Sequence, residues 1–245
     1  MMSPSEARLE ILADPEALAR RGAEWMLEMA TTKEGGFTVA LSGGSTPGRL
    51  YQLLARPPYR DTFPWSRTHW FWGDERFVPH DDPESNYRMA RQALLSQVPV
   101  PGANIHPVPT EGMAPDAAAA AYERALKAFY GAPVLNPERP LFDVVLLGLG
   151  PEGHTASLFP GTAILEEHQR WVGAVIGATP EPRITLTYPA LESCNEAAFL
   201  VAGPGKRAVV ERLFRGDREL PAARLRPVGR LRFFLDRAAA PEDPP

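Results

Sequence analysis

The sequence predicts an α/β fold with three layers, in which helices cover both faces of a largely parallel central sheet. Short apolar runs of strand length alternate along the chain with segments of helical periodicity. Such alternation is typical of parallel sheets, because each parallel strand needs a long return connection, usually a helix. The 245 residues can bury a large core and show no low-complexity linker, so we expect one domain over residues 1–245.

The first helix and the first strand are indicated by local start and stop signals. A helix is predicted to begin at Asp14-Pro15-Glu16, because Asp is a preferred N-cap and proline fits the first helical position. Small and apolar residues then recur at helical spacing: Leu18, Gly22, Trp25, Met26 and Met29. After Gly35-Gly36, the run from Phe37 to Leu41 has the length of a buried strand, and Pro47 can open the next helix.

The same pattern recurs further along the chain. Thr68 to Trp72 and Phe142 to Leu147 are apolar runs that are followed at once by polar or glycine-rich segments. Further strands are predicted at Trp171 to Ile176, Ile184 to Thr187, Ala197 to Val201 and Leu231 to Leu235, and further helices at Ala117 to Tyr130 and Lys206 to Phe214. Because ligands bind beyond the carboxyl ends of parallel strands, we expect the polar motifs that follow these strands to meet at one edge.

The composition excludes several classes of function. Hydrophobic residues make up 44% of the chain and charged residues 23%, as in an ordinary globular protein. The net charge is -4 and the sequence has no basic block, so it predicts no positively charged surface that would bind nucleic acid or an anionic membrane. No stretch approaches the roughly 20 apolar residues of a membrane span, and no targeting segment is visible. The single cysteine, Cys194, excludes an intrachain disulfide, suits a cytoplasmic location and is expected in the core.

Ser42-Gly43-Gly44-Ser45-Thr46, which follows the first predicted strand, has the chemistry of an anion-binding loop. Glycines let the backbone approach a ligand closely, hydroxyls donate hydrogen bonds, and the N-terminus of the next helix favours negative charge. Phosphate is therefore the predicted ligand. The alternative is a tight turn in which Thr46 only caps the helix. The Gly-x-x-x-x-Gly-Lys-Ser/Thr spacing of a nucleotide-binding loop is absent.

A glycine-rich turn, Gly148-Leu149-Gly150-Pro151-Glu152-Gly153, follows the strand predicted at Phe142 to Leu147. It matches the dinucleotide pattern Gly-x-Gly-x-x-Gly, but the acidic residue expected about 20 positions later is missing. We therefore expect no nicotinamide or flavin cofactor. His154 directly follows this turn, and an imidazole held at the carboxyl edge of a central strand is suited to act as a general base.

Nucleophile and metal motifs are missing from the sequence. Neither a Gly-x-Ser-x-Gly elbow nor a Ser-x-x-Lys motif with its partners is present, so direct attack by water is favoured over an acyl-enzyme. The remaining histidines lack the spacing of metal ligands and are interpreted as surface or packing residues: His69, His80, His106 and His168. No metal is expected, although Asp74, Glu75 and Glu152 can still converge on one from distant positions.

The charged triplet Asp74-Glu75-Arg76 appears where the aromatic strand at Thr68 to Trp72 ends. Arg76 can hold a developing oxyanion or a phosphate with its planar donors, and the acidic pair can orient it or compete as a base. The alternative is a solvated turn. The following segment, Asp81 to Asn86, is predicted to cap a helix, and its end at Asn86 can add contacts to a polyol.

Taken together, these segments resemble one family, the 6-phosphogluconolactonases of the pentose phosphate pathway. The resemblance covers nearly the whole chain and rests on Ala40 to Pro47, Trp72 to Arg76, Asp82 to Asn86, Gly148 to Gly161, Arg183 to Thr187 and Gly203 to Lys206. It implies the Rossmann-like (NagB/RpiA-like) fold shared with glucosamine-6-phosphate deaminases, and 6-phospho-D-glucono-1,5-lactone as substrate. One departure is Glu152, because the family usually has Asp in Asp-Gly-His-Thr-Ala-Ser.

The resemblance also places Arg183 and Lys206 around the ligand with the Ser42 to Thr46 loop, and we expect these groups to bind the phosphate. His154 is expected to take a proton from water as the water attacks the lactone carbonyl, and to return it to the ring oxygen. Glu152 then orients the water or His154, while Arg76 stabilises the oxyanion or the phosphate. A small molecule is thus the expected partner, and the chain is expected to be a monomer or a weak homo-oligomer.

Two alternatives stay open at this point. An aldose-ketose isomerising deaminase of the same superfamily typically has a carboxylate five residues after the catalytic histidine, where this chain has Phe159. A non-enzymatic sugar-phosphate sensor calls for a DNA-binding segment, and the sequence contains no basic helix. Both alternatives are therefore disfavoured against the lactonase.

Overall fold

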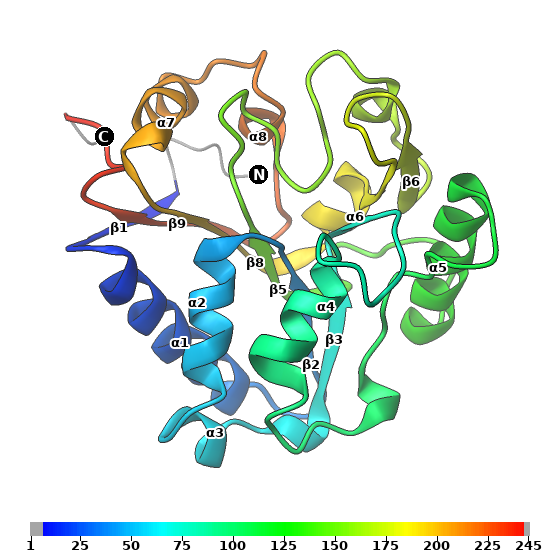
Figure 1. Cartoon of the computed structure of the whole chain (residues 1–245), viewed down its shortest axis with the longest axis horizontal. Coiled ribbons are helices and arrows are strands. Elements are labelled where there is room, and N and C mark those ends of the chain that lie inside the picture. Colours follow the sequence, from blue (N-terminus) through cyan, green and yellow to red (C-terminus); the bar gives the residue numbers. More distant parts are fainter. Residues whose placement is uncertain (1–6, 243–245) are drawn as a thin grey trace.

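The main sheet contains six strands, all parallel, in the order β1-β9-β8-β5-β2-β3 (Figure 1). The computed structural model describes residues 7–242. The strands are β1 (Arg8–Leu12), β2 (Phe37–Leu41), β3 (Thr68–Trp72), β5 (Phe142–Leu147), β8 (Cys194–Val201) and β9 (Arg230–Asp236). Cys194, at the start of β8, is fully buried as expected. The predicted α/β class with a largely parallel sheet is confirmed.

Eight α-helices occur in residues 7–242: α1 (Pro15–Thr32), α2 (Ser45–Leu54), α3 (Tyr59–Thr62), α4 (Asn86–Ala90), α5 (Pro115–Tyr130), α6 (Tyr188–Glu192), α7 (Arg207–Phe214) and α8 (Pro221–Arg224). Single turns of 3₁₀ or π helix lie at Trp65–Arg67, Arg91–Leu95, Gly102–Asn104, Ala163–Glu166 and Pro204–Lys206. Asp14 caps α1, since its carboxylate accepts from the N–H of Ala17 at 2.8 Å. Helix α2 begins at Ser45, two residues before the predicted start at Pro47.

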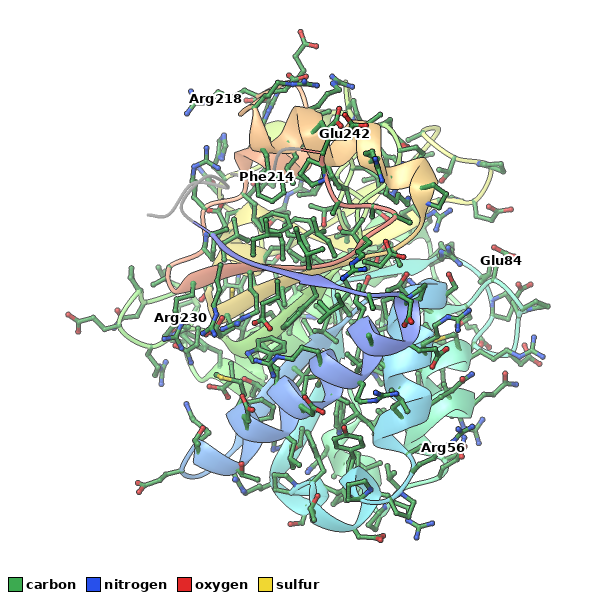
Figure 2. All side chains as sticks on the ribbon, turned by 90° about the vertical axis from the view of Figure 1, so that its left-hand side faces the viewer. Arg56, Glu84, Phe214, Arg218, Arg230 and Glu242 are labelled. Carbon is green, nitrogen blue, oxygen red and sulfur yellow. The ribbon has the colours of Figure 1, made fainter. Side chains whose placement is uncertain are left out.

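Two adjacent phenylalanines on β9 show which helices cover the two faces of the main sheet. Their side chains point to opposite faces, because successive side chains of a strand alternate. The ring of Phe234 packs 5.4 Å from that of Trp25 on α1, and the ring of Phe233 packs 5.0 Å from that of Phe214 on α7. Helix α1 therefore covers one face and α7 the other. Figure 2 shows α1 below β1 and β9, and Phe214 above them.

A second, smaller sheet corrects part of the sequence prediction. Strands β4 (Asp74–Arg76), β7 (Arg183–Leu186) and β6 (Val172–Val175) pair antiparallel in the order β4-β7-β6. The runs predicted at Trp171 to Ile176 and Ile184 to Thr187 thus lie outside the parallel sheet, and the charged triplet is a strand rather than a turn. Gly73 joins the two sheets, because its N–H donates to Leu41 on β2 and its carbonyl accepts from Leu186 on β7, both at 2.8 Å.

The strand order creates a switch point in the middle of the main sheet. From β2 the chain continues outward to β3 on one side, whereas β5, β8 and β9 follow one another on the other side. The carboxyl ends of β2 and β5 therefore open a crevice between the loops that follow them. The two loops lie close together, since a Cβ placed on Gly148 would be 3.7 Å from the hydroxyl of Ser42.

Candidate active site

A cavity of about 500 Å³ lies at this switch point, between the main sheet and the smaller one. All twelve residues that the sequence nominated line it: Ser42, Gly43, Gly44, Ser45, Thr46, Asp74, Arg76, Asn86, Glu152, His154, Arg183 and Lys206. They come from the ends of β2 and β5, from the paired strands β4 and β7, and from the starts of α4 and α7. The expected convergence is therefore observed, although Asp74, Arg76 and Arg183 come from the smaller sheet and not from the edge of the main one.

The loop after β2 leaves the start of α2 open to a ligand. Gly44 is the N-cap of α2 and no side chain within residues 7–242 caps the helix, so Thr46 does not have the capping role of the alternative interpretation. Gly43 is required by a close approach, because a Cβ there would lie 2.0 Å from the side-chain oxygen of Asn86. Tyr51 fixes the loop, since its hydroxyl accepts from the N–H of Ser42 at 3.0 Å and donates to its carbonyl at 2.8 Å.

Two arginines stand side by side at the smaller sheet. Arg76 and Arg183 are directly opposite each other in the β4–β7 pairing, which brings two like charges together. Burial and the charge of Arg76 lower the pKa of Arg183. Arg76 donates to the carbonyl of Glu84 at 2.5 Å, and Arg183 donates to the hydroxyl of Thr179 at 3.1 Å. Because like charges repel, an anion bound between the two guanidinium groups would stabilise this arrangement.

Glu75 stabilises the fold, and both oxygens of its carboxylate are occupied by hydrogen bonds within the protein. Its carboxylate is buried and accepts four hydrogen bonds from donors at the start of α4 and on β4: the N–H groups of Arg76, Asn86 and Tyr87 at 2.7 to 2.8 Å, and the hydroxyl of Ser85 at 3.2 Å. Burial raises the pKa of the Glu75 carboxyl although these donors favour its ionised form. Glu75 is therefore not available as a competing base.

Asp74, on the opposite face of β4, lines the cavity. One of its carboxylate oxygens accepts a hydrogen bond from the hydroxyl of Ser157 at 2.7 Å, and its backbone carbonyl accepts from the Asn86 amide at 3.0 Å. Within residues 7–242, no cluster of three or more Asp, Glu, His and Cys side chains could hold a metal ion. The convergence of Asp74, Glu75 and Glu152 on a metal is thus not seen in the described part of the chain.

The glycine turn after β5 sets the position of His154. The N–H of Gly150 donates to the carbonyl of His154 at 2.9 Å, and the N–H of Gly153 donates to the carbonyl of Gly150 at 2.9 Å. The imidazole then folds back against the turn, because a Cβ on Gly150 would lie 2.0 Å from its Nδ1. The ring of Phe159 lies on the imidazole, with 4.5 Å between the ring centroids.

Glu152 stands beside the imidazole as an ionised carboxylate. Its Oε1 lies 2.9 Å from Nδ1 of His154, but the oxygen is not in line with the ring N–H, so the contact is electrostatic rather than a formed hydrogen bond. Burial opposes its ionisation, yet its own backbone N–H, the imidazole and Lys206 together lower the pKa of Glu152. Lys206 donates to the carbonyl of Leu149 at 2.6 Å, which holds its ammonium group at this end of the cavity.

Among the lining residues that sequence reasoning did not nominate, three contact nominated side chains. Ser157 holds Asp74, Thr179 holds Arg183 and Phe159 packs on His154. No local pattern could have paired Ser157 with Asp74, because 83 positions separate them. The other histidines are used for packing or lie on the surface: His69 contacts His106 at 3.2 Å, His80 contacts the carbonyl of Val108 at 2.8 Å, and His168 is exposed.

Comparison with known proteins shows the family to which the chain is similar. The family model of glucosamine-6-phosphate isomerases/6-phosphogluconolactonase matches residues 13–233. The chain is 42% identical to a 6-phosphogluconolactonase of Nostoc sp. over 96% of its length and 97% of that protein. It is 38% identical to a 6-phosphogluconolactonase of Streptomyces coelicolor over 94% of its length and 95% of that protein.

Solved structures show the same fold. The 6-phosphogluconolactonase of Thermotoga maritima superposes with a TM-score of 0.80 at 29% identity, covering 94% of this chain and all of that one. A monomeric glucosamine-6-phosphate deaminase superposes with a TM-score of 0.79 at 19% identity, covering 95% of this chain and 98% of that one, which shows a shared fold alone. No helix in residues 7–242 is both long enough and apolar enough to cross a bilayer. From the family match and the relatives' identity over nearly their full length, the chain belongs to the 6-phosphogluconolactonase family.

Proposed function

We propose that the protein hydrolyses 6-phospho-D-glucono-1,5-lactone to 6-phospho-D-gluconate. The observation that carries the proposal is one cavity that is lined both by an imidazole with its neighbouring carboxylate and by a pair of arginines. Hydrolysis of a phosphorylated lactone needs a base that activates water near the carbonyl. It also needs cations that bind the phosphate and stabilise the developing oxyanion. The activity named for the Nostoc relative supports the same reaction.

His154 acts as the general base. It takes a proton from water as the water adds to the lactone carbonyl, and it returns the proton to the ring oxygen as the tetrahedral intermediate collapses, so no covalent intermediate forms. The carboxylate of Glu152, 2.9 Å from Nδ1, stabilises the imidazolium that exists between these two steps. Glu152 can do this although its side chain is one methylene longer than the Asp that the family usually has.

The phosphate binds to the uncapped start of α2, with Arg183 and Lys206 as its cations. The Ser42 to Thr46 loop faces the cavity with free helix N–H groups, which attract anions. Arg76 stabilises either the oxyanion or the phosphate, and kinetics separate the two. An oxyanion role predicts that Arg76→Ala lowers kcat, whereas a phosphate role predicts mainly a higher KM. A variant in which neither constant changes would show that Arg76 is not part of the site.

The proposed activity is tested by following proton release from the lactone, with the spontaneous rate subtracted. We expect rapid hydrolysis of the phosphorylated lactone, much slower hydrolysis of the unphosphorylated one and no conversion of glucosamine 6-phosphate. Turnover of glucosamine 6-phosphate instead would establish the deaminase alternative. That outcome is not expected, because the apolar ring of Phe159 packs on His154 at the position where a carboxylate is required. The same assay after exhaustive chelation tests the expected independence of metal.

A cytoplasmic location and a monomeric or weakly associating state belong to the same proposal. Every nominated residue lines one cavity of a single chain, which supports a site built within one subunit. Size-exclusion chromatography with light scattering measures the association state directly. A stable dimer of high affinity at micromolar concentration would contradict this part of the proposal.

A further inference from the structure

Two neighbouring carboxylates on β4 have opposite surroundings. Glu75 accepts four hydrogen bonds, one from the N–H of Arg76 on β4 and three from donors at the start of α4, which hold β4 to that helix. Asp74 points the other way, and in residues 7–242 only the Ser157 hydroxyl donates to its carboxylate, through Oδ2. The second oxygen, Oδ1, is thus left for the cavity that Asp74 lines. A carboxylate used only to stabilise the fold would have both oxygens paired, as Glu75 does.

Ser157 is itself held from two sides. Asp74 and Thr185 are register partners in the β4–β7 pairing. The backbone N–H of Ser157 donates to the hydroxyl of Thr185 at 3.2 Å, and its own hydroxyl donates to Asp74 at 2.7 Å. Both Ser157 and Thr185 are buried. Because the backbone of Ser157 is held by Thr185, its hydroxyl reaches Asp74 from a defined position.

The segment that carries Ser157 keeps a strained backbone. Ala156, between His154 and Ser157 in the chain, has φ of 48°, in the left-handed region that is unfavourable for an L residue. Ala156 also lines the cavity. The unfavourable conformation turns the chain between the imidazole and Ser157, so that one short segment supplies the base and also reaches across to β4.

We propose that Ser157 is a positioning residue that fixes the carboxylate of Asp74 with Oδ1 toward the bound sugar. The inference rests on the proposed lactonase function and adds a specific role for Asp74, which accepts a hydrogen bond from a hydroxyl of the sugar. A donor to one carboxylate oxygen selects one rotamer, so Asp74 meets the ligand as a preorganised acceptor. Without that donor, the carboxylate rotates freely and binds the hydroxyl less well.

A double-mutant cycle tests this role. Ser157→Ala, Asp74→Asn and the double variant are compared in two measurements: kcat/KM for the phosphorylated lactone, and the affinity for 6-phospho-D-gluconate by calorimetry. Since Ser157 acts through Asp74, we expect Ser157→Ala to weaken both quantities by about 10-fold and Asp74→Asn by more. The double variant should be no worse than Asp74→Asn alone. Effects that multiply in the double variant, or a Ser157→Ala variant within about twofold of the wild type, overturn the proposal.

Thr185→Val provides the matched control. It removes the anchor of the Ser157 backbone but leaves the hydroxyl donor in place, so it reports what loosening the segment does by itself. Because this anchor sets the position from which Ser157 reaches Asp74, its effect on kcat/KM should be smaller than that of Ser157→Ala and should disappear in the Asp74→Asn background. Thermal melts establish that each variant is folded under the assay conditions. A wild type that does not hydrolyse the lactone overturns the proposed function, whereas an active wild type with independent Ser157 and Asp74 effects overturns this inference alone.

Discussion

At the scale of single residues, the imidazole of His154 depends on the absence of a side chain at Gly150. A Cβ at that position would lie 2.0 Å from Nδ1, a distance that requires the ring to move. We predict that Gly150→Ala lowers kcat about 100-fold or more, because displacement by even an ångström misplaces a general base. Steady-state kinetics with the phosphorylated lactone measure this.

The matched control for that substitution is Gly102→Ala. A Cβ at Gly102 meets no atom within 4 Å, and the residue lies in a surface turn away from the cavity. We expect its kcat to stay within about twofold of the wild type. Equal losses in the two variants would mean that the steric account of Gly150 is wrong.

The sequence predicts site residues well where they follow a strand directly. His154 and the Ser42 to Thr46 loop stand at the carboxyl ends of β5 and β2, where a parallel sheet places ligands whatever the details of packing. The interaction of Ser157 with Asp74 could not be predicted, because it depends on how β4 leaves the main sheet. A hydrogen bond between residues 83 positions apart leaves no periodic trace in the sequence.

At the scale of elements, two buried tyrosines hold the ends of neighbouring strands. The hydroxyl of Tyr51 bonds the N–H and carbonyl of Ser42 after β2, and the hydroxyl of Tyr122 bonds the same two groups of Trp72 at the end of β3. We predict that Tyr51→Phe lowers the free energy of unfolding by about 1 to 3 kcal/mol, since two buried backbone groups lose their partner. It should also raise KM, because Ser42 opens the loop proposed to bind phosphate.

Tyr122→Phe is the comparison that separates these two effects. It removes an equivalent pair of hydrogen bonds, but Trp72 does not line the cavity. Urea denaturation should show a similar loss of stability in both variants, while KM rises clearly only in Tyr51→Phe. A KM that is unchanged in Tyr51→Phe would remove the proposed link between this tyrosine and substrate binding.

Apolar runs of five or six residues predicted strands correctly, whereas the smaller sheet was not foreseen. Strands β6 and β7 lie at the runs predicted at Trp171 to Ile176 and Ile184 to Thr187, but the pattern of those runs does not state which sheet they join. Strand β4 is wholly charged, so hydrophobic periodicity could not find it. Strand β1 was also missed, because Arg8–Leu12 is a half-exposed edge strand that begins and continues with charged residues. Pairing with partners distant in the sequence determines all of these elements.

At the scale of the whole molecule, we propose that the chain behaves as a single domain. Helix α5 packs on both sheets, since Phe129 contacts Phe71 of β3 and Tyr130 contacts Trp171 next to β6. Because the smaller sheet shares this helix with the main sheet, it should not unfold by itself. We predict that urea curves followed by tryptophan fluorescence and by far-ultraviolet circular dichroism coincide. Two separated transitions would show that the smaller sheet is an independent unit.

The melting temperature should also fall as the pH is lowered, and part of this fall should depend on His106. Burial, and then the neighbouring His69, lower the pKa of His106 to about 4. The unfolded chain binds a proton at this residue near pH 6.5, so protonation favours unfolding as the pH falls from about 6.5 to about 4. Melting temperatures across that range should therefore decline less steeply for His106→Gln than for the wild type. The exposed His168→Gln should follow the wild type, and identical slopes for all three proteins would contradict the assignment.

The central claim is that His154 activates water for attack on the lactone. Its most direct test is kcat for the phosphorylated lactone in His154→Ala, with the spontaneous rate subtracted and with binding of 6-phospho-D-gluconate confirming an intact cavity. We predict that kcat falls by about 100-fold or more while the product still binds, because only the base is removed. A folded His154→Ala variant that turns over within about twofold of the wild type would contradict the account.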